Sequence, residues 1–294
     1  MNDLIIVTDG AADMPSEWIR DYRIHILPMP VLLGGKTIYL PSPEYPSEKF
    51  YRLIHELRQT PHSSLPSMDH LTRFYESIAI KGDEILSIHV AQRMSGTFSV
   101  VQSVANELKD RFQIYPFDSG AGSAALGMMC RQARQLAERG LSMDTIINQL
   151  EKAKKSLAIV LTLENLDFAR LSGRINAIQS MLSSVLRINP IIELREGLLQ
   201  VAGRVRTRKK AIDQLIEMVT EKAKAQKMRF AVVHAADPFA AATIKERLEA
   251  AIKAADISIC ELALPVAANL GPGTVGIVAY PDDESTNEDI ERDN

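Results

Sequence analysis

The stretch Leu4-Ile5-Ile6-Val7-Thr8-Asp9-Gly10 is a short apolar run that ends at an aspartate and a glycine. Such a run, closed by a turn signal, predicts a buried strand. Residues 84–90 and 113–117 repeat the pattern, and segments with helical spacing lie between the three runs. Strands that alternate with helices are typical of a parallel sheet wrapped by helices. The first half of the chain is therefore predicted to be a three-layer α/β/α domain.

The second half of the chain carries the signals of paired strands. Residues 157–163 form another apolar run, and runs at 188–194 and 198–201 flank the turn-forming Arg195-Glu196-Gly197. Runs so closely spaced around a glycine predict an antiparallel hairpin. This half is therefore predicted to be an α/β domain with a mixed or antiparallel sheet, and a ligand would lie between or beneath the two domains.

Segments with less regular patterns are assigned from their turn residues. Residues 24–40 predict a hairpin on a sheet edge, where prolines are tolerated. Residues 166–186 are expected to be mostly helical. Residues 257–264 and 274–280 are expected to be strands that are joined through Gly271-Pro272-Gly273.

Length and composition set the overall organisation. The 294 residues are 46% hydrophobic and 24% charged, which is typical of a globular chain, and the length predicts two domains. We expect the first domain at 1–155 and the second at 156–281, and parts of 41–80 are candidates for packing with the second domain. Residues 282–294 carry seven acids and one arginine without apolar periodicity, so they are expected to be a flexible acidic tail.

The net charge and the motifs that the chain lacks exclude several classes of function. A formal net charge of −3 argues against bulk nucleic-acid binding, which needs a basic surplus. The start of the chain lacks the features of a signal peptide, and no stretch approaches the roughly 18 apolar residues of a membrane span, so a cytoplasmic protein is expected. The sequence has no G-x-S-x-G, H-E-x-x-H or G-x-G-x-x-G motif and no metal-ligand spacing among its six histidines, so neither a metal nor a cofactor is predicted.

The two cysteines and two of the histidines lie in apolar surroundings. Cys130 and Cys260 are predicted to be reduced thiols of the core, since no zinc-ligand spacing surrounds them. His25 and His89 lie within predicted strands, so we expect them to have satisfied packing roles.

Ser95-Gly96-Thr97 is the most informative local feature, because it follows a predicted strand and opens a predicted helix. Amides at a helix start, two hydroxyls and a glycine that permits close approach form a seat for a phosphate or a carboxylate. The spacing alone is also typical of a plain helix cap. Ser63-Ser64-Leu65-Pro66-Ser67 presents hydroxyls ahead of another helix and has the same two interpretations.

Three charged features leave alternatives open. Arg174 follows Gly173 in an apolar region, where it is either a surface residue or the partner of a buried carboxylate. Residues 204–210 hold five cations, which form either a solvated face or a docking patch for an acidic partner or a phosphate. Asp9 and Asp118 follow predicted strands and are the candidates for a general base, should the chain be an enzyme that acts on a small anion.

Eight short motifs occur in a fixed order along residues 4–280. They are Val7-Thr8-Asp9-Gly10-Ala11-Ala12-Asp13-Met14-Pro15, Ser63-Ser64-Leu65-Pro66-Ser67, Ser95-Gly96-Thr97, Asp118-Ser119, Leu166-Asp167-Phe168-Ala169-Arg170-Leu171-Ser172-Gly173-Arg174-Ile175, Asn189-Pro190-Ile191, Arg206-Thr207 and Gly271-Pro272-Gly273. In kind and in order they resemble the motifs of the DegV family, whose members read T-D-S-x-A-D-L-P, T-S-Q-P-S, S-G-T, D-S, L-x-x-L-x-x-G-G-R-I and K-P-I-L at the first six positions.

The resemblance implies a two-domain DegV-like fold and a bacterial protein that binds one long-chain fatty acid in a closed apolar tunnel. The best-understood members are non-catalytic binding subunits of fatty acid kinase. They present the carboxylate to a separate ATP-dependent kinase subunit, which makes an acyl phosphate for phospholipid synthesis. Carried over by motif, the ligand-binding residues are Ser63, Ser95, Gly96, Arg174 and Asn269. The resemblance implies no catalytic residue and no stable membrane insertion.

One departure from the family pattern changes the expected chemistry at the carboxylate. Family members usually read H-T-G-P-G where this chain has Asn269-Leu270-Gly271-Pro272-Gly273. Asn269 can hydrogen-bond a carboxylate, but it cannot carry a titratable proton. Two alternatives therefore stay open: a lipid carrier or sensor without kinase coupling, and a small-anion enzyme that uses Asp9 or Asp118.

Overall fold

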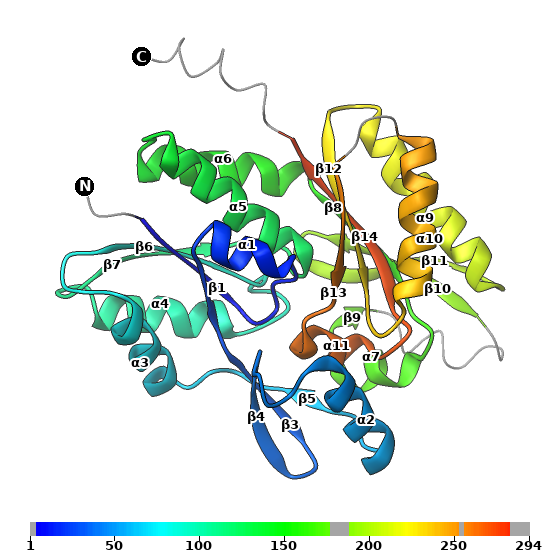
Figure 1. Cartoon of the computed structure of the whole chain (residues 1–294), viewed down its shortest axis with the longest axis horizontal. Coiled ribbons are helices and arrows are strands. Elements are labelled where there is room, and N and C mark those ends of the chain that lie inside the picture. Colours follow the sequence, from blue (N-terminus) through cyan, green and yellow to red (C-terminus); the bar gives the residue numbers. More distant parts are fainter. Residues whose placement is uncertain (1–3, 177–187, 253–255, 283–294) are drawn as a thin grey trace.

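Two large sheets, one small sheet and the helices that cover them make up the fold (Figure 1). The computed structural model describes residues 4–176, 188–252 and 256–282. One large sheet is parallel and the other is mixed, so the predicted fold class is confirmed. The proposed domain limits at 155 and 281 stay a prediction.

The first sheet consists of four parallel strands in the order β2-β1-β6-β7. They are β1 (Ile5–Asp9), β2 (Ile24–Leu27), β6 (Glu84–His89) and β7 (Gln113–Asp118). Because successive side chains of a strand point to opposite faces, Ile6 and Val7 enter different cores. This alternation makes both faces of the sheet apolar, and both are covered by helices.

Five helices form the outer layers around this sheet (Figure 1). They are α1 (Ser16–Asp21), α3 (Met68–Ile78), α4 (Thr97–Glu107), α5 (Ala124–Glu138) and α6 (Met143–Ser156). Leu71 and Tyr75 lie one turn apart on α3 and pack with Val7, so α3 and α4 cover the face that Val7 occupies. Ile6 packs with α5 and α6 on the other face. The predicted three layers are present.

The second sheet has seven strands in the order β13-β12-β14-β8-β10-β11-β9. The strands are β8 (Ala158–Thr162), β9 (Ile175–Asn176), β10 (Asn189–Arg195), β11 (Leu198–Val205), β12 (Met228–His234), β13 (Ile257–Glu261) and β14 (Val275–Pro281). Helices α9 (Arg208–Ala223) and α10 (Pro238–Ala251) cover one face. The predicted hairpin is confirmed as β10–β11, and Glu196 and Gly197 turn it with φ of 48° and 75°.

The hairpin predicted at residues 24–40 is present, but its predicted place on the edge of the main sheet is wrong. Strands β3 (Met29–Leu33) and β4 (Lys36–Leu40) pair with β5 (His62–Ser63) in a separate antiparallel sheet. Pro28 follows β2 and lacks the amide that would extend its ladder, so the chain leaves the first sheet there. Helix α2 (Ser47–Leu57) covers the small sheet and buries Phe50.

Two predictions in the second half are wrong. The residues between β13 and β14 include a helix, α11 (Leu264–Leu270), although residues up to 264 were expected to be a strand. Pro265 stands in its first turn, where the missing amide has no cost, and Gly271 ends it at a φ of 83°. Likewise, α7 (Leu166–Ser172) ends at Gly173, and Ile175 pairs with Leu199 in β9 instead of continuing a helix. The rest of the helix expected to 186 lies outside the described residues.

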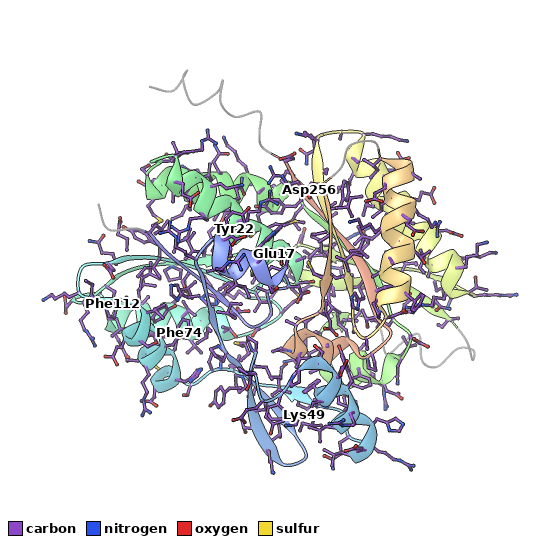
Figure 2. The ribbon with its side chains drawn as sticks, in the orientation of Figure 1. Glu17, Tyr22, Lys49, Phe74, Phe112 and Asp256 are labelled. Atoms are coloured by element: carbon purple, nitrogen blue, oxygen red, sulfur yellow. The ribbon has the colours of Figure 1, made fainter. Side chains whose placement is uncertain are left out.

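Side chains from both halves of the chain share one core. Ile6 and Leu86 of the first sheet, Cys130 of α5 and Val233 of the second sheet belong to the same cluster. At its surface, Arg131 lies 4.8 Å from the centre of the Trp18 ring and bonds Asp256 at 3.2 Å (Figure 2 labels Asp256). The two sheets are therefore packed as one body around α5.

The predicted core thiols are confirmed as buried, unpaired cysteines. Burial raises the pKa of Cys130 and of Cys260 to about 12, so both are neutral at physiological pH. Within the described residues, no helix is long and apolar enough to cross a membrane.

Candidate functional site

A cavity of about 330 Å³ lies between the loops at the carboxyl ends of the first sheet and one face of the second sheet. Its walls are mainly apolar, and the second sheet with its flanking loop contributes Ile159, Leu161, Leu194, Leu199, Val233 and Leu262. A volume of this size is typical of a site for a small organic ligand.

The polar lining of the cavity comes from segments far apart in the sequence. Ser63, Ser95, Arg174 and Asn269, all predicted as ligand-binding residues, line the same cavity. They come from β5, the turn before α4, the start of β9 and α11, respectively. The structure therefore brings four of the five predicted residues together.

Ser63 and Asn269 are bonded to each other. The Asn269 amide nitrogen, Nδ2, donates to Ser63 Oγ at 3.1 Å and to the Pro265 carbonyl at 2.8 Å. The second bond lies within α11, so the helix fixes the direction of the Asn269 side chain. Ser63 is placed by the pairing of β5 with Val31 of β3.

The Ser95 turn combines both predicted roles. Ser95 Oγ lies 2.8 Å from Thr97 Oγ1 and accepts the Thr97 amide at 3.3 Å, so it satisfies one amide at the start of α4. Ser95 also lines the cavity. The predicted cap contact and a place at the cavity therefore coexist.

Gly96 does not line the cavity; its role is to let two loops meet. A Cβ atom built on Gly96 would stand 3.0 Å from Leu65 Cδ1, which is too close for ordinary contact. Because residue 96 has no side chain, the loop that carries Ser63 can pack against the turn that carries Ser95. Leu65 is 50% exposed and also lines the cavity, so the cavity reaches the surface beside this turn.

Arg174 supplies the cationic side chain of the cavity. Its guanidinium donates to the Ser172 carbonyl at 2.5 Å, and among the described residues it has no acidic partner. The predicted alternative of a bond to a buried carboxylate of the chain is therefore absent from the described residues. A half-buried cation without a carboxylate is suited to bind an anionic ligand.

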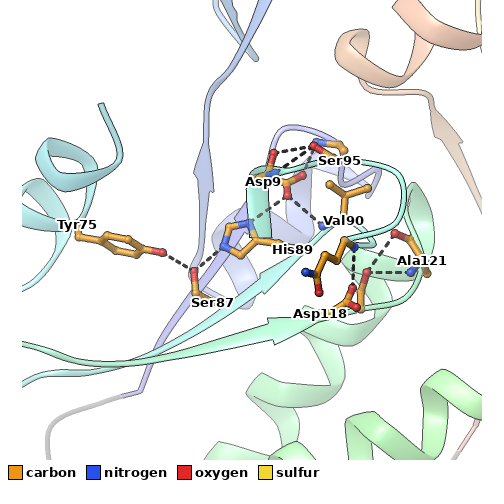
Figure 3. A network of polar contacts seen from close by, with 12 residues as sticks. Asp9, Tyr75, Ser87, His89, Val90, Ser95, Asp118 and Ala121 are labelled. Carbon is orange, nitrogen blue, oxygen red and sulfur yellow. Dashed lines mark hydrogen bonds and ion pairs between the residues drawn. The ribbon is translucent and has the colours of Figure 1, made fainter. Parts of the chain in front are cut away.

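The two acids considered as enzymatic bases hold backbone instead of facing the cavity (Figure 3). Asp9 is fully buried and accepts the amides of Ala11 at 2.9 Å and Val90 at 3.0 Å. Asp118 accepts the amides of Gln92 and Gly120 at 3.1 and 3.0 Å. Neither acid lines the cavity, so the geometry does not favour the small-anion enzyme.

Sequence reasoning missed a buried acid next to the cavity. Asp13 accepts a short hydrogen bond from Ser123 Oγ and the Ala263 amide at 2.6 Å. Ser123 lines the cavity, and Ala263 precedes α11. Burial raises the pKa of the Asp13 carboxyl to about 7. The only signal for this contact in the sequence is the second aspartate of the first motif.

The basic run at 204–210 divides into two parts. Arg208 bonds Asp237 at 2.6 Å and the Gly273 carbonyl at 2.7 Å, and Thr207 caps α9. The other four cations are exposed: Arg204, Arg206, Lys209 and Lys210.

Comparisons with known proteins agree with the order of motifs and with the fold. A family model described as "Uncharacterised protein, DegV family" matches residues 3–282. This chain belongs to the DegV family. Protein DegV of Bacillus subtilis is 31% identical over 277 residues, which cover 94% of this chain and 98% of the relative.

Solved structures of other DegV proteins have the same fold. The crystal structure described as DegV, a fatty acid binding protein from Bacillus subtilis, has a TM-score of 0.85 at 28% identity and covers 95% of this chain and 99% of that one. A DegV family protein from Thermus thermophilus, described by its fatty acid binding, also has a TM-score of 0.85, at 27% identity with coverage of 95% and 100%.

Proposed function

We propose that this DegV protein binds one long-chain fatty acid in the 330 Å³ cavity, with its carboxylate at the end formed by Ser63, Ser95, Arg174 and Asn269. The single observation that carries the proposal is this combination of an apolar cavity with one cation that has no acidic partner among the described residues. The fatty acid binding stated for the Bacillus and Thermus relatives supports it.

The energetics of such a complex are favourable. Burying about 15 methylene groups at about 0.8 kcal/mol each contributes on the order of 12 kcal/mol. Ordering a flexible chain offsets part of this gain. The carboxylate must be paired, because a buried unpaired charge is very costly. Arg174, the Ser63 and Ser95 hydroxyls and, in the first turn of α4, the Gly96 amide are the donors that we assign to it.

We propose further that the protein acts in the cytoplasm as the non-catalytic subunit of a fatty acid kinase and presents the carboxylate to an ATP-dependent partner. The position of half-exposed Leu65 between the Ser95 turn and the surface supports access from outside. The exposed cations Arg204, Arg206, Lys209 and Lys210 are candidates for contact with an acidic surface of the partner.

Asn269 favours a second candidate function, a lipid carrier or sensor without kinase coupling. Its amide is already bonded to Ser63 and to the Pro265 carbonyl, and it has no proton that titrates. The same cavity would then hold the lipid, but no acyl phosphate would form.

Binding is tested by calorimetric titration of the delipidated protein with palmitate. We expect saturable binding of one molecule; heat changes that never saturate would contradict the proposal. Coupling is tested by adding a competent kinase subunit and ATP to the loaded protein. Acyl phosphate formation supports the kinase subunit. If it forms only after Asn269→His, the carrier function is favoured instead.

A further inference from the structure

A chain of four buried side chains crosses the first sheet beneath the cavity (Figure 3). Asp9 Oδ2 lies 3.0 Å from His89 Nδ1, His89 Nε2 lies 2.7 Å from Ser87 Oγ, and Ser87 Oγ lies 2.8 Å from the Tyr75 hydroxyl. All four residues have no exposed surface. Four linked polar groups in a core call for an explanation, because burial of polar groups is tolerated only when they are satisfied.

The order Asp9, His89, Ser87 is that of a nucleophilic triad, but its position excludes that role. Ser87 lies on the central strand β6 and does not line the cavity. Its hydroxyl is held by Tyr75 of α3, on the side of the sheet away from α5. No substrate carbonyl can approach this oxygen, as a triad requires.

The chain of hydrogen bonds ends at backbone groups of the cavity. The carboxylate of Asp9 accepts the amide of Ala11 through Oδ1 and the amide of Val90 through Oδ2. Both residues line the cavity. Because an ionised carboxylate only accepts, His89 donates from Nδ1, and a neutral imidazole then accepts at Nε2 from Ser87.

The Ser95 turn continues from this anchor point. Ala91, the residue after Val90, accepts the amides of Met94 at 2.9 Å and Ser95 at 3.1 Å through its carbonyl. Ala91 itself donates its amide to the Ala121 carbonyl at 2.7 Å. The place of the Ser95 hydroxyl therefore depends on where Asp9 holds Val90.

We propose that Asp9 and His89 are positioning residues for the ligand carboxylate. His89 fixes the Asp9 carboxylate, Asp9 fixes Ala11 and Val90, and Val90 sets the turn that carries Ser95. The inference rests on the proposed function and adds residues that do not touch the ligand. Preorganised donors bind a charge better than mobile ones, so loss of this support weakens recognition of the carboxylate more than recognition of the alkyl chain.

The test compares binding of palmitate with binding of hexadecanol, which has the same chain and no charge. His89→Leu removes the donor to Asp9, whereas His89→Asn keeps one, because Asn Nδ2 occupies nearly the position of His Nδ1. We expect His89→Leu to lower the preference for palmitate over hexadecanol by about tenfold and His89→Asn to restore most of it. Asp9→Asn, which is isosteric and loses the acceptor for Val90, should act like His89→Leu and serves if that variant does not fold.

Three results overturn the inference. An unchanged preference in folded His89→Leu or Asp9→Asn removes any link between these residues and the carboxylate. Equal weakening of both ligands, without recovery in His89→Asn, shows a general structural role. Wild-type protein that binds neither ligand contradicts the proposed function itself and removes the basis of the inference, and it is recognised before any variant is made.

Discussion

The side chains of Ser63 and Asn269 are bonded at 3.1 Å although 206 residues separate them in the chain. The bond joins β5 of the small sheet to α11, which leads into the second sheet through β14. It thereby ties the serine loop to the end of the cavity where the predicted carboxylate ligands meet. The cavity is thus built by contacts between distant segments, and its ligands can be tested one at a time.

Replacing Asn269 by alanine removes two hydrogen bonds at this end of the cavity. Ser63 then loses its partner and is less well placed for the carboxylate. We expect the affinity for palmitate to fall by about tenfold and that for hexadecanol to change by less than about threefold, as measured by calorimetry. An equal loss for both ligands would show that Asn269 shapes the alkyl tunnel instead.

Replacing Arg174 by alanine removes the cation that we assign to the carboxylate. Palmitate affinity is expected to fall by more than about tenfold, while the free energy of unfolding changes by about 0.5 kcal/mol or less, because Arg174 bonds only its own chain neighbourhood. Arg170→Ala is the matched control, since Arg170 is exposed and pairs with Asp167 on α7. Palmitate binding that is lost equally in both variants would contradict the assignment.

Gly96→Ala tests the contact between the two serine segments. The added methyl group would meet Leu65 at 3.0 Å and push the serine loop away from the Ser95 turn. Palmitate affinity is expected to fall several-fold with little change in stability, because half-exposed Leu65 is free to move. Adding Leu65→Ala should recover part of the loss in a double-mutant cycle. Additive losses would mean that the two residues act independently.

The stability of the protein should depend on the ionisation of Asp13. Burial raises its pKa from 3.8 to about 7 in the folded state, so the folded protein holds this proton more tightly than the unfolded chain. The stabilisation from protonation is therefore complete below about pH 4 and is lost as the pH rises through 7. We expect urea denaturation between pH 5 and 7.5 to show a steeper loss of stability in the wild type than in Asp13→Asn. Parallel curves would contradict a raised pKa.

Local patterns in the sequence identify most of the main strands. The run around Val7 and the alternation that follows it indicate the parallel sheet, and Gly197 indicates the β10–β11 hairpin, because both signals depend only on residues close in the chain. Helix α11 was missed because Pro265 was read as part of a connection, whereas it stands in the first turn of a helix that the packing of Leu264 and Ala268 against Phe50 stabilises. That contact is non-local, so no pattern near residue 265 reveals it.

The site was predictable only as a set of residue types. The resemblance in motifs suggested Ser63, Ser95, Arg174 and Asn269, and the structure places them around one cavity. The bond between Asp13 and Ser123 and the support of Val90 by Asp9 depend on loops that meet in space. Spacing along the chain carries no information on such contacts, and Asp9 in particular looks like a catalytic base until its hydrogen bonds are known.

Native mass spectrometry of the protein as purified, followed by extraction and identification of bound lipid, tests the central claim most directly. The account predicts one fatty acid per chain, lost on replacing Ser95 by tryptophan while the folded charge-state distribution is retained. A protein that is empty as purified and takes up no added fatty acid would contradict the account.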